Sequence, residues 1–159
     1  MTSDLAAARL ALEQGQLDRA EALLQEWLRQ HPNNADALER LAIVRARSGD
    51  PQGAEVLLHQ ALQSDPRHRQ ALTNLGALLQ RLGRSSEAGP WLEQATTLHP
   101  DHADAWANLA VVHREGGDLT GADLQPSLFR VRLLSRAEAP APLKPSSWLR
   151  GPYFNRVAT

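Results

Sequence analysis

Apolar residues recur at spacings of three and four in the middle of the chain, which is the periodicity of one face of an α-helix. In the segment 35–48 this stripe contains Leu38, Leu41 and Ala42, and charged residues occupy most other positions. In 51–64 the same spacing is kept by Ala54, Leu57, Leu58, Ala61 and Leu62. We therefore expect one helix in each segment.

The residues between and after these two segments are helix stop and start signals. Gly49 follows the first segment, and a glycine just past a helix commonly closes it. Asp50 and Pro51 come next, an N-cap residue followed by a proline at the first helical position. Asp65 and Pro66 end the second helix, because proline disfavours helical backbone in the residue before it. The pattern predicts a helix–turn–helix unit.

The same unit repeats every 34 residues along the chain. Three prolines keep this spacing, and three further sets of equivalent residues keep it too: Pro32, Pro66, Pro100; Gly15, Gly49, Gly83, Gly117; Ala20, Ala54, Ala88, Ala122; and Leu24, Leu58, Leu92. A fixed period of this length indicates a solenoid of stacked units. Further helices are expected at 3–14, 17–30, 69–82 and 86–98. The recurring alanines are expected where the second helix of a unit crosses the first.

These residues resemble the tetratricopeptide repeat, a 34-residue helix–turn–helix unit with small residues at fixed positions and a closing proline. The match is best in 69–102, at Leu72, Leu75, Gly76, Leu79, Ala88, Leu92, Ala95 and Pro100. The resemblance implies an all-α solenoid of about three and a half repeats. The expected organisation is a degenerate repeat at 1–34, repeats at 35–68 and 69–102, a partial repeat at 103–125, a capping helix at 126–138 and a tail at 139–159.

Three places depart from the repeat pattern. Arg45 stands where an aromatic residue or leucine is usual. Gly89 and Pro90 fall early in an expected helix, so we expect Ser85 or Ser86 to be the N-cap and the helix to begin late or to bend mildly. Pro126 makes a full helix at 119–132 improbable. The loss of the repeat pattern after Ala122 is what a frameshift or truncation would also leave.

Composition narrows the class of protein. The 159 residues contain no cysteine, which excludes disulfides and thiolate chemistry, and the net charge of −1 argues against nucleic-acid binding. No apolar run is long enough to span a membrane, no secretory signal is recognised, and a cytoplasmic location is expected. Residues 121–159 hold 6 basic and 2 acidic side chains, and four prolines lie in the last twenty residues, which predicts a mostly disordered basic tail at 139–159.

No enzyme motif, cofactor motif or metal-ligand pattern is present, so the chain is expected to be non-catalytic, without a cofactor or metal. His31, His99 and His102 are expected in exposed loops, and His113 is expected to be partly buried.

Resemblance to tetratricopeptide proteins implies binding of a protein or extended peptide on the concave surface, which the first helix of each unit lines. The candidate residues on that surface are Arg40, Arg47, Asn74, Arg81 and Asn108. Arg40, Asn74 and Asn108 occupy equivalent positions, and a carboxamide can both donate to and accept from a peptide backbone. Protein-glycosylating enzymes of this family carry a similar asparagine ladder. Solvated helix surface is the alternative interpretation of these residues.

Other functions remain open at this point. One alternative is that the repeats form a substrate-presenting or targeting arm of a larger enzyme, such as a protein-modifying transferase or hydroxylase, that is truncated here. Self-association through the exposed end of the solenoid is a further alternative. The family's clamp for the C-terminal carboxylate of heat-shock chaperones fits poorly, because no lysine precedes Lys144.

Overall fold

The computed structural model describes residues 3–116, and every regular element in that range is a helix. The seven helices of this range are α1 (Ser3–Glu13), α2 (Leu17–Gln30), α3 (Ala35–Arg47), α4 (Pro51–Ser64), α5 (Arg69–Arg81), α6 (Ser85–Leu98) and α7 (Ala103–Glu115). The bounds of α1 to α6 lie within one residue of the six predicted helices, and the all-α prediction is confirmed. The end of the partial repeat, the capping helix at 126–138 and the tail at 139–159 lie outside the described residues.

The turn inside each helix pair has the same geometry three times. Gly15, Gly49 and Gly83 adopt φ angles of 73°, 87° and 75°. This left-handed conformation is accessible to glycine without strain, which explains why glycine recurs at this place. The residue after each glycine donates its backbone N–H to the carbonyl five residues earlier, as in Gln16 to Ala11 at 2.9 Å. This bond closes the first helix of the pair as a Schellman motif.

Side chains cap the helices that follow. Asp50 accepts a bond from the backbone N–H of Gly53 at 2.8 Å, so its predicted capping role ahead of Pro51 is confirmed. Asn34 accepts in the same way from Ala37 at 2.8 Å and begins α3. These bonds satisfy N–H groups that have no partner inside the helix.

The predicted N-cap of α6, Ser85 or Ser86, is wrong. Arg84 is the N-cap residue, no side chain caps the helix, and Pro90 lies inside it. Arg84 donates from Nε and Nη2 to the two carboxylate oxygens of Glu87, both at 2.7 Å, and this holds the first turn together. The same hydrogen bonds lower the pKa of Glu87. Gly89 has no Cβ to clash with the ring of Pro90, so the helix continues through the proline.

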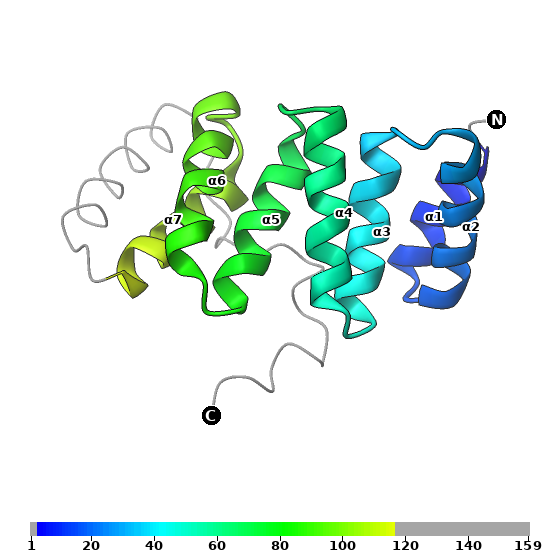
Figure 1. The fold of residues 1–159 in the computed structure, drawn as a ribbon, viewed down its shortest axis with the longest axis horizontal. Coiled ribbons are helices and arrows are strands. Elements are labelled where there is room, and N and C mark those ends of the chain that lie inside the picture. Colours follow the sequence, from blue (N-terminus) through cyan, green and yellow to red (C-terminus); the bar gives the residue numbers. More distant parts are fainter. Residues whose placement is uncertain (1–2, 117–159) are drawn as a thin grey trace, which may run out of the picture. The chain divides into compact units, whose positions relative to one another are not determined.

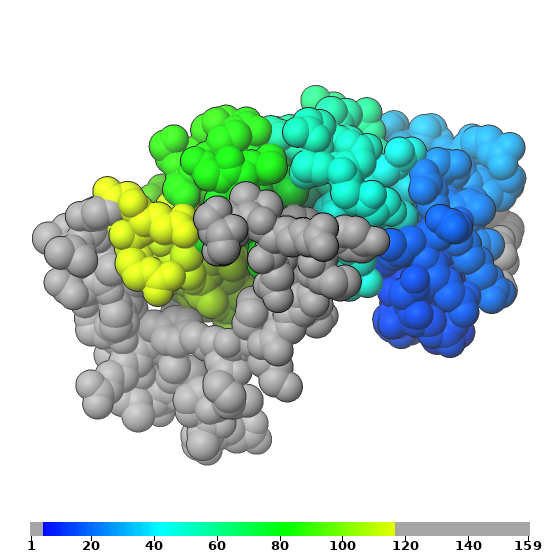
Figure 2. Space-filling model, turned by 90° about the horizontal axis from the view of Figure 1, so that it is seen from below, coloured from blue at the N-terminus to red at the C-terminus, as the bar shows by residue number. Residues whose placement is uncertain are grey.

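The chain divides into two compact units, and the division falls between Ala71 and Leu72 within α5. In the first unit, α1 packs on α2, α2 on α3 and α3 on α4, in chain order (Figure 1). Ala20 and Leu24 of α2 are fully buried in its core, and Ala54 of α4 is also fully buried. The surface of α1 forms one end of this unit (blue in Figure 2), and Leu10 on α1 is 53% exposed.

The second unit holds the rest of α5 together with α6 and α7. Ala88, Leu92 and Ala95 of α6 are fully buried, and α6 packs on α7. Gly76 of α5 lies so close to Leu92 that an added Cβ would stand 2.4 Å from the Leu92 Cγ. The small residue at this position therefore permits the close approach of α5 and α6.

Arg45 shows why the first unit departs from the repeat pattern. Its Nη2 lies 2.8 Å from the Glu21 carboxylate on α2, and its Nη1 lies 3.6 Å from Asp50. The side chain is 38% exposed, so the charged head remains partly hydrated. An ion pair therefore occupies the position where an apolar residue was expected.

Candidate functional site

The candidate binding residues lie on the first helix of each pair. Arg40 and Arg47 are on α3 in the first unit, while Asn74 and Arg81 are on α5 and Asn108 is on α7 in the second unit. Arg40 and Arg47 are seven residues apart, which places them about 10.5 Å apart along one face of α3. Asn74 and Arg81 have the same spacing on α5.

Arg40 presents a buried hydrogen-bond donor. Its Nε is inaccessible to solvent and finds no acceptor among residues 3–116, and the side chain as a whole is half-buried. A buried donor without a partner is costly, because it has lost its bonds to water without replacing them.

Asn108, two periods after Arg40, has the same property. The residue is only 7% exposed, and its side-chain Nδ2 has no acceptor within the part of the chain that the structure describes. Asn74, between them in sequence, is 3% exposed. Sequence patterning indicated a solvent-facing ladder, whereas both asparagines are buried. Because the Nδ2 of Asn108 is covered, a ligand could reach it only if the side chains around it moved.

Arg47 is engaged within the fold. Its Nη1 donates to the backbone carbonyl of Leu12, near the end of α1, at 3.2 Å. The same carbonyl also accepts the backbone N–H of Gly15 at 3.1 Å, so it receives two hydrogen bonds. Burial lowers the pKa of Arg47, and it also lowers the pKa of Arg81 on α5. The hydrogen bond of Arg47 therefore connects α3 to the C-terminal end of α1.

The histidines differ in part from expectation. His102 directly precedes α7, and its side chain is only 8% exposed. The prediction that it lies in an exposed loop is therefore wrong. His113 is half-buried, as predicted. His31 stacks on Trp27 with ring centroids 4.1 Å apart.

His68 is a residue whose role sequence reasoning missed. Its Nδ1 accepts the backbone N–H of Ala71 at 3.1 Å and caps α5. Because Nδ1 is the acceptor, the proton is on Nε2, which donates to Asp36 Oδ1 at 3.0 Å. The available signal was its position: His68 is 34 residues after Asn34, the residue that caps α3.

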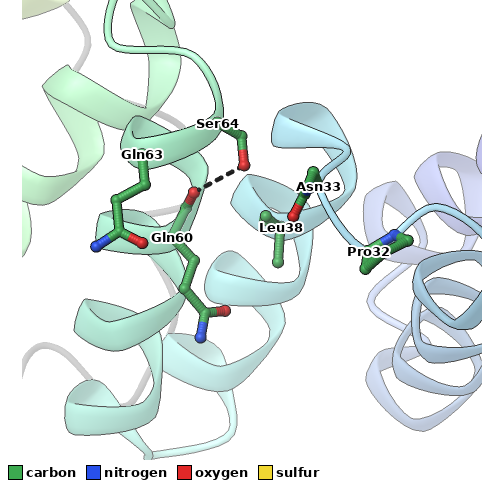
Figure 3. Close-up of a pocket in the computed structure, with 6 residues that line it drawn as sticks. All are labelled: Pro32, Asn33, Leu38, Gln60, Gln63 and Ser64. Atoms are coloured by element: carbon green, nitrogen blue, oxygen red, sulfur yellow. Dashed lines mark hydrogen bonds between the residues drawn. The ribbon is translucent and has the colours of Figure 1, made fainter.

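A hollow of about 610 Å³ lies in the first unit beside the loop that precedes α3 (Figure 3). The residues that line it are Pro32, Asn33, Leu38, Gln60, Gln63 and Ser64. The Ser64 hydroxyl donates to the Gln60 carbonyl at 3.1 Å along its edge. None of the six side chains titrates near neutral pH, so the hollow offers no acid–base chemistry. Leu38 is two residues from Arg40, which directs the two side chains to nearly opposite sides of α3.

Within residues 3–116 no group of three or more histidine, aspartate or glutamate side chains is placed to hold a metal ion. None of the helices in the same range combines the length and the apolar character that crossing a membrane would require.

Helix pairs at a 34-residue period, turned by glycine and crossed at small residues, define the class of tetratricopeptide repeat proteins. More narrowly, the chain belongs to the family described as the cilia and flagella-associated protein 70 middle TPR-like domain, whose sequence model matches residues 5–134. A comparison with curated protein sequences finds no match.

Solved structures with the same fold come from several kinds of protein. PilF of Pseudomonas aeruginosa is 27% identical with a TM-score of 0.76, over 87% of this chain and 62% of that one. An O-GlcNAc transferase mutant of Thermobaculum terrenum is 28% identical with a TM-score of 0.67, over 70% of this chain. The chain spans only 22% of that transferase. The first TPR of Spaghetti (RPAP3), bound to the HSP90 peptide SRMEEVD, is 19% identical with a TM-score of 0.68, over 71% of this chain and 92% of that one, and shows the fold alone.

Proposed function

We propose that this chain is a non-catalytic protein-interaction scaffold that binds an extended peptide on the first helices of its repeats. The proposed binding residues are Arg40, Arg47, Asn74, Arg81 and Asn108. The observations that carry the proposal are the family match over residues 5–134 and the recurrence of Arg40, Asn74 and Asn108 at one position of the first helices.

An extended peptide matches these donors chemically. Each of its residues presents a backbone carbonyl, and an extended strand leaves these carbonyls without partners. A guanidinium and a carboxamide can each donate to such an oxygen. The fold is able to hold a peptide, since the Spaghetti repeat domain is solved with one. Membership of a tetratricopeptide family supports the same role for this chain.

A display selection tests the proposal. Random twelve-residue peptides are selected on the immobilised full chain, and the affinity of enriched peptides is measured by fluorescence polarisation. The variant Asn108→Ala should weaken binding about fivefold, which corresponds to the loss of one hydrogen bond of about 1 kcal/mol. Gln25→Ala is the matched control, because Gln25 is an exposed carboxamide on the second helix of a pair. It should leave the affinity unchanged.

Two outcomes count against the proposal. If selection on the full chain enriches no peptide, the proposed peptide-binding function is wrong. If the enriched peptides bind Asn108→Ala as tightly as the unaltered chain, the assignment of Asn108 to the binding site is wrong. Gln60→Ala, in the hollow of Figure 3, shows whether that hollow binds instead.

A second candidate function is a substrate-presenting arm of a protein-modifying enzyme. The likeness to the O-GlcNAc transferase favours it, since this chain resembles a part of that protein. The coding sequence after residue 159 tests this candidate. An open frame that encodes a catalytic domain supports it, and a stop followed by unrelated sequence counts against it.

A further inference from the structure

We propose that the hollow beside the loop before α3 is a binding site for a guanidinium group, such as the side chain of an arginine on a partner protein. The hollow lies within the first unit, at the C-terminal end of α4 (Figure 3). The residues proposed above to bind an extended peptide do not line it. The inference therefore concerns a second site and does not depend on the proposed function.

The last turn of α4 contains carbonyl groups that lack the donors which continue a helix. Pro66 has no N–H to donate to the carbonyl of Leu62, four residues earlier. The N–H of Arg67 donates to Asp65 Oδ1 at 3.0 Å, and not to the carbonyl of Gln63. Gln63 is exposed and lines the hollow, so a donor from outside the helix can reach this end of α4.

The same end of α4 is electrically negative. The dipole of a helix places a partial negative charge of about half a unit at its C-terminal end. No basic residue stands in the last turn of α4, and the exposed Asp65 follows the helix directly. A cation in the hollow is therefore favoured by the helix end and by the carboxylate, and an anion is disfavoured.

The side chains of the wall present acceptors and no positive charge. Asn33, Gln60 and Gln63 each carry a carboxamide oxygen. The Ser64 hydroxyl uses its only proton in the bond to the Gln60 carbonyl, to which it donates at 3.1 Å (Figure 3). Toward a ligand, the Ser64 oxygen can therefore only accept. None of the lining residues is arginine, lysine or histidine, so no cation of the wall competes for these oxygens.

A guanidinium group fits this set of acceptors better than an ammonium group does. It has five N–H donors in one plane and no acceptor, so it can bond to several of the oxygens at once. It is also more weakly hydrated than an ammonium, so it loses less when it leaves water. Pro32 and Leu38 form the apolar part of the wall, against which the aliphatic stem of an arginine can pack.

The test titrates the full chain with N-acetyl-arginine amide, whose only charge is the guanidinium. The matched probe is N-acetyl-citrulline amide, which has nearly the same shape and no charge. Binding is followed by NMR through the side-chain NH₂ signals of Asn33, Gln60 and Gln63. These signals should shift to saturation with a dissociation constant on the order of 1 mM for the arginine probe, and about tenfold higher for the citrulline probe.

Charge changes at Gln60 test the assigned position. Gln60→Glu places a carboxylate in the wall and should tighten binding of the arginine probe about tenfold, whereas Gln60→Lys should weaken it about tenfold. Gln52→Glu is the matched control, because it makes the same change at an exposed glutamine about 12 Å earlier along α4. At about 0.15 M salt this distance exceeds the Debye length of about 8 Å, so the affinity should stay unchanged. Circular dichroism verifies that each variant is folded.

A further variant identifies the source of the guanidinium. Residues 121–159 of this chain hold 6 basic side chains, which are a possible source besides a partner. All six are changed to glutamine in the full chain. Tighter binding of the arginine probe by this variant shows that the segment competes for the hollow, and an unchanged affinity assigns the hollow to a separate partner. Both results support the guanidinium site.

Three results would overturn the inference. The first is that the NH₂ signals of the hollow do not shift with the arginine probe. The second is that the citrulline probe binds as tightly as the arginine probe, and the third is that Gln60→Glu binds no tighter than Gln52→Glu. Each of them leaves the proposed peptide-binding function intact, because that function is tested by peptide selection and by Asn108→Ala.

Discussion

Gly76 gives the sharpest stability prediction, because its change to alanine sets two opposed effects against each other. Gly76 is in the interior of α5, where alanine is favoured over glycine by about 1 kcal/mol. An added Cβ, however, would stand 2.4 Å from Leu92 Cγ, 2.7 Å from Cδ2 and 3.1 Å from Cδ1. Leu92 is fully buried and cannot move toward solvent.

The magnitude follows from these two terms. Normal contact requires Leu92 to withdraw by about 1 Å, and inserting a methyl group into a packed core costs about 1–3 kcal/mol. With the helix-propensity gain subtracted, Gly76→Ala should lower the free energy of unfolding by up to about 2 kcal/mol. For a urea slope of about 2 kcal/mol per molar, the midpoint should fall by up to about 1 M.

Urea unfolding of the full chain, followed by circular dichroism, measures the effect in a double-mutant cycle. In a Leu92→Ala background the clash is gone, so Gly76→Ala should there raise the unfolding free energy by about 1 kcal/mol. Ala110→Gly is the matched control, because residue 110 is the equivalent position on α7 and is exposed. It should cost about 1 kcal/mol through propensity alone. A Gly76→Ala variant that is more stable than the unaltered chain would refute the close approach of α5 and α6.

Two further changes test the turns and caps. Gly49→Ala meets no atom within 4 Å, so its cost, about 1–2 kcal/mol, should come only from the φ of +87°, and Gly49→Asn should cost less in the same urea assay. His68→Ala removes the cap on the Ala71 N–H and should cost about 1 kcal/mol, whereas His68→Asn should retain most of the stability because Asn34 caps α3 from the equivalent position. Equal melting temperatures for the alanine and asparagine variants of His68 would contradict its capping role.

The helices and turns were predictable because their signals are local. The spacing of apolar residues, Asp50 before Pro51 and a glycine at each tight turn all act within a few residues of their own positions. A repeating fold presents the same local signals every 34 residues, so each repeat reinforces the assignment of the next. Even so, the N-cap residue of α6 was predicted wrongly, because Arg84 precedes the helix without a side-chain cap and instead pairs with Glu87.

For the site, the sequence by itself determined which positions are equivalent: Arg40, Asn74 and Asn108 follow from the period alone. Only the tertiary structure decided that Asn74 and Asn108 are buried and that Arg40 Nε lacks an acceptor among residues 3–116. Burial and pairing depend on side chains far away in sequence, as in the bond of Arg47 to Leu12, 35 residues apart. A periodic pattern specifies the face on which a residue lies, but the helices packed around that residue determine whether its polar atoms find a partner.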